Sequence, residues 1–198
     1  MTEKLIESYL RKQSSVGLIK EEDIGIFRYG YALMIEVFIN FIVSILIGLL
    51  LGEVIMALAF LVAFIPIRSF AGGYHADKAW KCVILSNAVI AAAICIAQVM
   101  SKLDHVILFA LIEVILGVII FLLAPVQSIN KKLSALEVTF YKRIVLIIYA
   151  IEIMEEMISF QFGYKDIACI ILIAHVVVVV SLLAGTIQNR THEKIVND

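Results

Sequence analysis

A histidine and a cysteine lie seven residues apart in the stretch RSFAGGYHADKAWKC, which covers residues 68–82. Gly72 and Gly73 precede His75 and let the backbone bend back, so the imidazole can approach the thiol of Cys82. A Cys–His pair is the minimum equipment for nucleophilic acyl transfer. The lysines between the two residues favour the thiolate form of the cysteine. The stretch is therefore a candidate thiol active site.

Other residues of this stretch could serve the same chemistry. Arg68 could hold a substrate carboxylate through the planar fork of its guanidinium. The backbone N–H groups of Gly72 and Gly73 could stabilise a developing oxyanion. Two plainer roles stay open, because the glycines could form only a turn and Arg68 could be an interfacial residue with its stem in the membrane.

A metal site is the competing chemistry for the same stretch. His75, Asp77 and Cys82 are all potential ligands. A closed zinc site takes four ligands, however, and no second cysteine stands at the CxxC spacing. We therefore expect neither a metal nor another cofactor here.

The composition of the chain indicates the solvent around these residues. Of the 198 residues, 63% are hydrophobic and 17% are charged, whereas a soluble domain has roughly 45–50% and about 25%. A chain of this size cannot bury so much apolar surface in its own core, so the lipid bilayer is an expected partner. The net charge of −1 and the absence of long like-charge runs argue against nucleic-acid binding.

The apolar runs predict an all-α fold, a polytopic membrane helical bundle with about six hydrophobic segments in a single domain over residues 1–198. A span needs about 20 residues, and 54–67 is short and contains Pro66, so it could be re-entrant. The segment 144–161 contains three glutamates that a lipid-facing helix would not tolerate. The six segments are 31–51, 54–67, 83–100, 106–126, 144–161 and 167–187.

An amphipathic helix precedes the first span, within the region 1–28. Leu5, Ile6, Tyr9 and Leu10 share one face of this helix. It could lie on the membrane surface or pack on the chain's own residues.

The basic residues predict the orientation. Fourteen of the 16 Lys and Arg residues fall in the N-terminal region, the stretch 68–82, the basic loop 127–143 and the C-terminal tail. The positive-inside rule places all of these in the cytosol. Both termini and the candidate active site are therefore expected on the cytosolic face.

Polar residues recur every four positions in the first span, at Glu36, Asn40 and Ser44, and small residues continue the stripe at Gly48 and Gly52. Such a stripe must face protein or water. It could be a helix-packing face, since small residues let helices approach closely, or a substrate groove.

Five further polar residues lie within later apolar segments. Glu152, Glu155 and Glu156 share a helical face and require a cavity, an interface or a basic partner. Glu113 and His175 are isolated, and we expect each to make an interhelical hydrogen bond rather than to act in catalysis.

Two cysteines, Cys95 and Cys169, lie inside apolar runs. We expect them to behave as small buried hydrophobic residues without a disulfide.

The pattern Arg68-x-x-x-Gly72-Gly73-x-His75, followed by Cys82, resembles the signature of the accessory gene regulator protein B (AgrB) family of bacterial quorum-sensing membrane peptidases. Chain length and the multi-span profile are also similar to that family. So is the passage from Ala124-Pro125 into Asn130-Lys131-Lys132. The chain departs from the family at Leu133, since members often have further prolines around the basic residues.

The resemblance implies a role for each matched residue. Cys82 would be the nucleophile and His75 the general base and later acid of a cysteine endopeptidase in the bacterial cytoplasmic membrane. The substrate would be a short precursor signalling peptide, similar to the family's AgrD substrates, with an amphipathic leader and an acidic tail. Removal of the tail would leave a thioester, and an internal Cys or Ser would close a thiolactone or lactone ring. Lys131 and Lys132 could attract the acidic tail.

The family resemblance, together with the small-residue face of the first span, adds a homodimer to the expectations. Two other classes of protein remain open. A carrier or transporter subunit for a charged solute would depend on the intramembrane glutamates and tolerate loss of Cys82. A membrane scaffold would have no chemistry at all.

Overall fold

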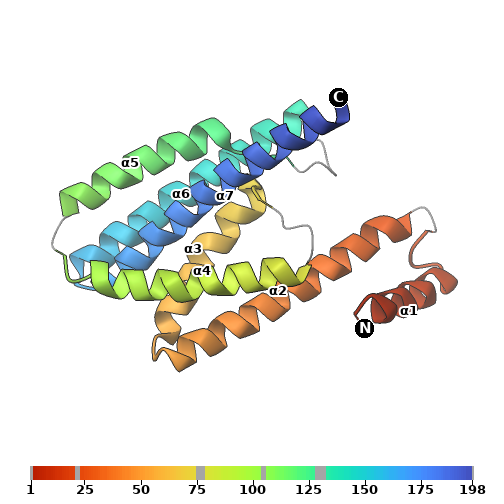
Figure 1. Cartoon of the computed structure of the whole chain (residues 1–198), viewed down its shortest axis with the longest axis horizontal. Helices are drawn as coiled ribbons and strands as arrows, with labels where there is room; N and C mark the ends of the chain where they lie inside the picture. Colours follow the sequence, from red (N-terminus) through yellow and green to blue (C-terminus); the bar gives the residue numbers. More distant parts are fainter. Residues whose placement is uncertain (1, 21–22, 75–78, 104–105, 128–132, 198) are drawn as a thin grey trace. The chain divides into compact units, whose positions relative to one another are not determined.

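The structure, a computed structural model, describes residues 2–20, 23–74, 79–103, 106–127 and 133–197. It confirms the all-α class, because the described residues form helices joined by short connections and contain no strand (Figure 1). The helices are α1 (Thr2–Ser15), α2 (Ile24–Leu50), α3 (Val54–Ala71), α4 (Ala79–Met100), α5 (Val106–Leu123), α6 (Ala135–Gln161) and α7 (Lys165–Asn197).

The chain divides into two compact units, Met1–Val43 and Ser44–Asp198. In the first unit, α1 is the amphipathic helix that the sequence predicts. Its residues Ile6 and Leu10 are buried against Ile24 of α2. These contacts favour packing on the chain's own residues for this face.

The second unit is built around α7. This helix contacts α3, α4, α5 and α6, and Figure 1 shows it running beside α5 and α6. Every residue from 168 to 175 is buried. A helix that is apolar on all sides is expected at the centre of a bundle, and residues 167–184 have that composition apart from His175 and Ser181.

Four helical segments are long and apolar enough to cross a membrane: Val54–Ala71, Trp80–Met100, Val106–Leu123 and Lys165–Thr191. The apolar stretch Val37–Leu50 in α2 is shorter. The outer face of α5 exposes a row of large apolar side chains, as expected of a helix in contact with lipid. The described residues thus support a membrane setting, and the count of six segments stays a prediction.

Two helices differ in extent from the segments that the sequence predicted. The segment 54–67 is part of an 18-residue helix that continues through Pro66. The segment 144–161 is the second part of α6, which begins at Ala135. Much of the predicted basic loop 127–143 is therefore helical.

A capping box explains the early start of α6. The Ser134 side chain accepts the backbone N–H of Glu137, and the Glu137 carboxylate accepts the backbone N–H of Ser134 at 2.8 Å. Together these bonds satisfy N–H groups that a helix start leaves without partners.

The small residues along α2 have two different structural roles, helix packing and helix termination. A Cβ on Gly48 would lie 2.8 Å from the Cβ of Ala57 in α3, so this glycine permits close helix packing as predicted. Ser44 is buried. Gly52 instead has φ +73° and open space around it, so it ends α2 rather than packing against a helix.

Candidate active site

The stretch that carries the candidate active site begins inside a helix. α3 continues past Pro66, so Arg68 lies in its last turn. The backbone N–H of Gly72 closes this turn on the carbonyl oxygen of Arg68, at 3.2 Å. The Arg68 guanidinium donates from Nη2 to the carbonyl oxygen of Tyr74, at 2.5 Å. The non-helical part of the stretch 68–82 therefore starts only at Gly72, and the Arg68 side chain holds its first residues through the bond to Tyr74.

Both glycines of the motif have a positive φ, +71° at Gly72 and +125° at Gly73, which residues with a side chain rarely adopt. A Cβ on Gly72 would overlap the carbonyl group of Val126, and a Cβ on Gly73 would lie 2.7 Å from Oγ of Ser181. On the facing helix, a Cβ on Gly185 would lie 2.5 Å from the carbonyl carbon of Gly73. The glycines are needed for close packing here, and their role as oxyanion donors stays a prediction.

Hydrogen bonds hold the same segment from two sides. The backbone N–H of Val126 donates to the carbonyl oxygen of Ala71, at 2.8 Å. The backbone N–H of Tyr74 donates to the carbonyl oxygen of Ser181 in α7, at 2.9 Å. The chain is therefore fixed in place up to the residue that precedes His75.

The first residue of the basic loop 127–143 is also bonded to α7. Asn189 donates from Nδ2 to the carbonyl oxygen of Gln127, at 2.7 Å, and the Gln127 side chain accepts the backbone N–H of Leu133, at 3.1 Å. The two anchor points on α7 are eight residues apart, about 12 Å along a helix. Lys131 and Lys132 lie outside the described residues, between two positions that are held here.

Cys82 lies in the first turn of α4 and is half-buried. Trp80 and Lys81, beside it, are exposed, and Nζ of Lys81 lies 5.9 Å from the centroid of the Trp80 ring. His75 lies outside the described residues, as does Asp77.

The other two cysteines differ from each other. Cys169 is buried in α7, as predicted. Cys95 is exposed on α4, and the prediction that it is buried was wrong, because the apolar run around it faces outward as well as inward. None of the three cysteines, all of them described, forms a disulfide.

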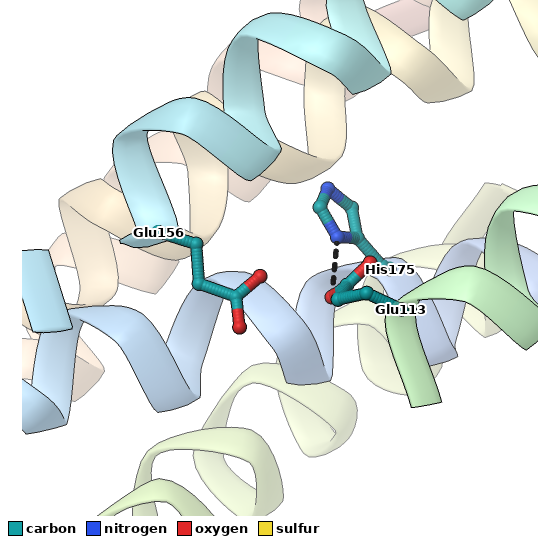
Figure 2. Close-up of side chains that lie close together, drawn as sticks. All are labelled: Glu113, Glu156 and His175. Carbon is teal, nitrogen blue, oxygen red and sulfur yellow. Dashed lines mark hydrogen bonds and ion pairs between the residues drawn. The ribbon is translucent and has the colours of Figure 1, made fainter. Parts of the chain in front are cut away.

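A second group of polar residues lies between α5, α6 and α7. Nδ1 of His175 lies 2.9 Å from a carboxylate oxygen of Glu113, and Nε2 lies 2.9 Å from one of Glu152. Glu156 lies beside them, and its carboxylate extends from α6 toward the pair formed by His175 and Glu113 (Figure 2). The interhelical hydrogen bonds predicted for Glu113 and His175 are confirmed. Of the three glutamates for which a cavity, an interface or a basic partner was predicted, Glu152 has a basic partner in His175.

A tyrosine completes this group. The hydroxyl of Tyr149 in α6 donates to the side chain of Glu113, at 2.5 Å, and lies 2.6 Å from its carbonyl oxygen. A Cβ on Gly117 of α5 would lie 2.8 Å from the Tyr149 ring, so this glycine makes room for it. Glu155, predicted on the same face as its two neighbours, is exposed. The sequence did not reveal that these groups meet, because that depends on how three helices are rotated.

The fold and the candidate site together define the class of protein. The chain is an all-helical membrane protein in which residues 72–74 are held against the central helix α7, and the next helix, α4, begins at Ala79 and carries Cys82 in its first turn.

The family follows from comparison with known proteins. The model of the accessory gene regulator B (AgrB) family matches residues 3–183. The chain therefore belongs to the AgrB family, and this membership supports a part in processing a quorum-sensing peptide. No curated protein matches the chain, and no solved structure does.

Proposed function

We propose that the chain is a membrane-embedded cysteine endopeptidase that removes the C-terminal tail of a short precursor signalling peptide and allows the rest to cyclise. One observation carries the proposal. Tyr74, directly before His75, is held on α7 through Ser181, and Cys82 lies in the first turn of the next helix, which begins at Ala79. Residues 75–78, which include His75, are all that separates Tyr74 from the first residue of α4 in the chain, and this short connection supports an approach of the imidazole to the thiol.

The proposed reaction starts with the thiolate of Cys82, which attacks the peptide carbonyl before the tail. The C–N bond breaks, and the tail leaves as an amine that takes a proton from the His75 imidazolium. A thioester then joins the peptide to the enzyme. An internal cysteine or serine of the peptide gives its proton to His75 and attacks the thioester, so that Cys82 leaves as a thiolate and the ring closes.

Ring closure consumes no water, and water is its competitor. Exchange of a thioester for a thiolactone is close to isoenergetic, so hydrolysis would win in an open site. A site at the membrane boundary, between packed helix ends, limits the access of water. Lys81 is exposed beside Cys82, and Lys131 and Lys132 follow Gln127 in the chain; these basic residues would attract an acidic tail.

Co-expression with a precursor peptide and mass spectrometry of the products test this function. The peptide has a few tens of residues, a central Cys or Ser and an acidic tail. Wild-type protein should release the tail, and Cys82→Ala or His75→Ala should each leave the peptide intact at normal expression. Cys95→Ala, on the same helix as Cys82, is the matched control and should cleave as wild type.

The second candidate function, a carrier for a charged solute, predicts the opposite result. A carrier would tolerate Cys82→Ala and depend on Glu152 and Glu156, which are buried within the bundle. Normal tail removal by the Cys82→Ala protein would rule out the peptidase.

A further inference from the structure

The polar group between α5, α6 and α7 contains more acid than base. Glu113, Glu152 and Glu156 are at most 7% exposed, and His175 is fully buried. The ion pairs that the structure gives to Glu113 and Glu152 are both with His175. Three carboxylates and one imidazolium would leave two negative charges unbalanced, and burying unbalanced charge is strongly unfavourable. A ligand imidazole is neutral, so a divalent cation bound to the cluster would leave one unbalanced negative charge instead of two.

Glu156 points independently to a missing ligand. Its side chain is 7% exposed, and its Oε2 is buried without a hydrogen-bond partner among the described residues. Figure 2 shows this carboxylate directed toward the other two side chains. Buried polar atoms nearly always have a partner in folded proteins, so a hydrogen-bond donor or a cation is expected next to this oxygen.

The geometry suits a metal ion. One ligand atom each from Glu113, Glu156 and His175 lies within 4.8 Å of the other two. Atoms that share an ion at about 2.0–2.2 Å lie about 3–4 Å apart, so closure requires these separations to shorten by about 1–2 Å at most.

The carboxylate of Glu152 also fixes the His175 ring, through the ring nitrogen that would not bind the ion. With Nδ1 of His175 as the ligand nitrogen, Nε2 remains bonded to Glu152 at 2.9 Å. Metal-binding histidines usually have such an outer partner, which fixes the ring and its tautomer. Tyr149 holds Glu113 in the same way through its hydroxyl.

We propose that Glu113, Glu156 and His175 bind a divalent transition-metal ion, Zn²⁺ or Mn²⁺, that fastens α5, α6 and α7 together within the bundle. One imidazole nitrogen and two carboxylate oxygens form a mixed donor set that suits these ions. The site is separate from the segment that carries Cys82, and its role is structural. It would make the stability of the bundle depend on metal.

Metal binding by the purified full-length protein tests the proposal. The protein is prepared in detergent with any polyhistidine tag removed, treated with a chelator, and dialysed against Zn²⁺ or Mn²⁺ alone. We expect about one ion per chain by elemental analysis. We also expect a rise in the thermal unfolding midpoint when the ion is added back, because a ligand that binds only the folded state stabilises it.

Three variants on α6 and α7 locate the site. Glu156→Gln and His175→Gln keep the side-chain size and should abolish binding. Glu152→Gln, which removes only the outer partner, should weaken binding by about 10- to 100-fold. Glu155→Gln changes an exposed carboxylate beside Glu156 and should bind as wild type.

Two results would overturn the metal site. One is wild-type protein that binds neither ion and whose unfolding midpoint responds to pH but not to metal, which would mean that protons alone satisfy the cluster. The other is a Glu156→Gln protein that elutes as wild type in size exclusion and binds the ion with unchanged affinity. The wild-type measurement decides the question even where a variant does not fold.

Discussion

Arg68 is the residue for which the structure changes the expected role most. The sequence offers its guanidinium to a substrate carboxylate, whereas in the structure Nη2 donates to the carbonyl oxygen of Tyr74. The residue that it holds directly precedes His75 in the chain. A positioning role for Arg68 therefore accounts for its place in the motif without any contact to the peptide.

Substitution Arg68→Lys separates the two roles. Lysine keeps the charge but lacks the planar fork of donors. If Arg68 positions the loop, cleavage should fall by about tenfold or more, and by the same factor for a precursor with an acidic tail and for one whose tail carboxylates are amidated. The rates of tail release from both peptides are the measurement. A loss confined to the acidic-tail peptide would instead assign Arg68 to substrate recognition.

Single residues also mark the limit of what the sequence can predict. Glu113 and His175 were correctly expected to bond across helices, because lipid cannot satisfy a polar side chain. Their common cluster was not predicted, because helices far apart in sequence must be correctly rotated before Glu113, Tyr149 and His175 meet. Glu155 shows the same limit, since spacings of three and four residues do not tell which carboxylates turn inward.

At the scale of helices, the apolar runs of the sequence predicted where most of the helices lie, but they did not predict the residues at which the helices begin and end. The runs reflect the length of a bilayer crossing, which is why α3, α4, α5 and α7 coincide with predicted segments. Ends depend on local bonds instead. The Ser134–Glu137 capping box starts α6 before its apolar part, and α3 continues through Pro66 to Arg68 and beyond.

Among the contacts between helices and their connecting segments, the one between Gly73 and Gly185 matters most for the candidate active site. It allows the segment after α3 to lie directly on α7. Gly185→Ala places a methyl group 2.5 Å from the carbonyl carbon of Gly73, which is too close for contact, so the segment must move. Because a small misplacement of reacting groups is costly, we expect tail release to slow by about 10- to 100-fold. Quantification of released tail against membrane protein amount is the measurement.

Gly30→Ala is the matched control for this variant. A Cβ on Gly30 would meet nothing within 4 Å, and alanine favours a helix over glycine. The control should cleave as wild type. Unchanged cleavage by Gly185→Ala would mean that the contact with α7 does not position the segment.

At the scale of the whole molecule, α4 links the candidate active site to the orientation of the chain. Trp80–Met100 is one of the candidate spans. Cys82 lies at its first turn, and Lys102 is exposed just after its last residue. If α4 crosses the bilayer, these two positions lie on opposite sides, and the distribution of basic residues predicts that Cys82 is the one in the cytosol.

Thiol labelling with a membrane-impermeant maleimide tests this orientation. Cys95 and Cys169 are first replaced by Ala, so that Cys82 is the one remaining thiol; a second protein also carries Cys82→Ala and Lys102→Cys. In intact cells the reagent should label the cysteine at position 102 and not Cys82, and in inside-out vesicles it should label Cys82 and not position 102. Labelling of Cys82 in intact cells would reverse the orientation and separate the thiol from a precursor made in the cytosol. Labelling of both positions from one side would mean that α4 does not cross, and the site would then need another route to its substrate.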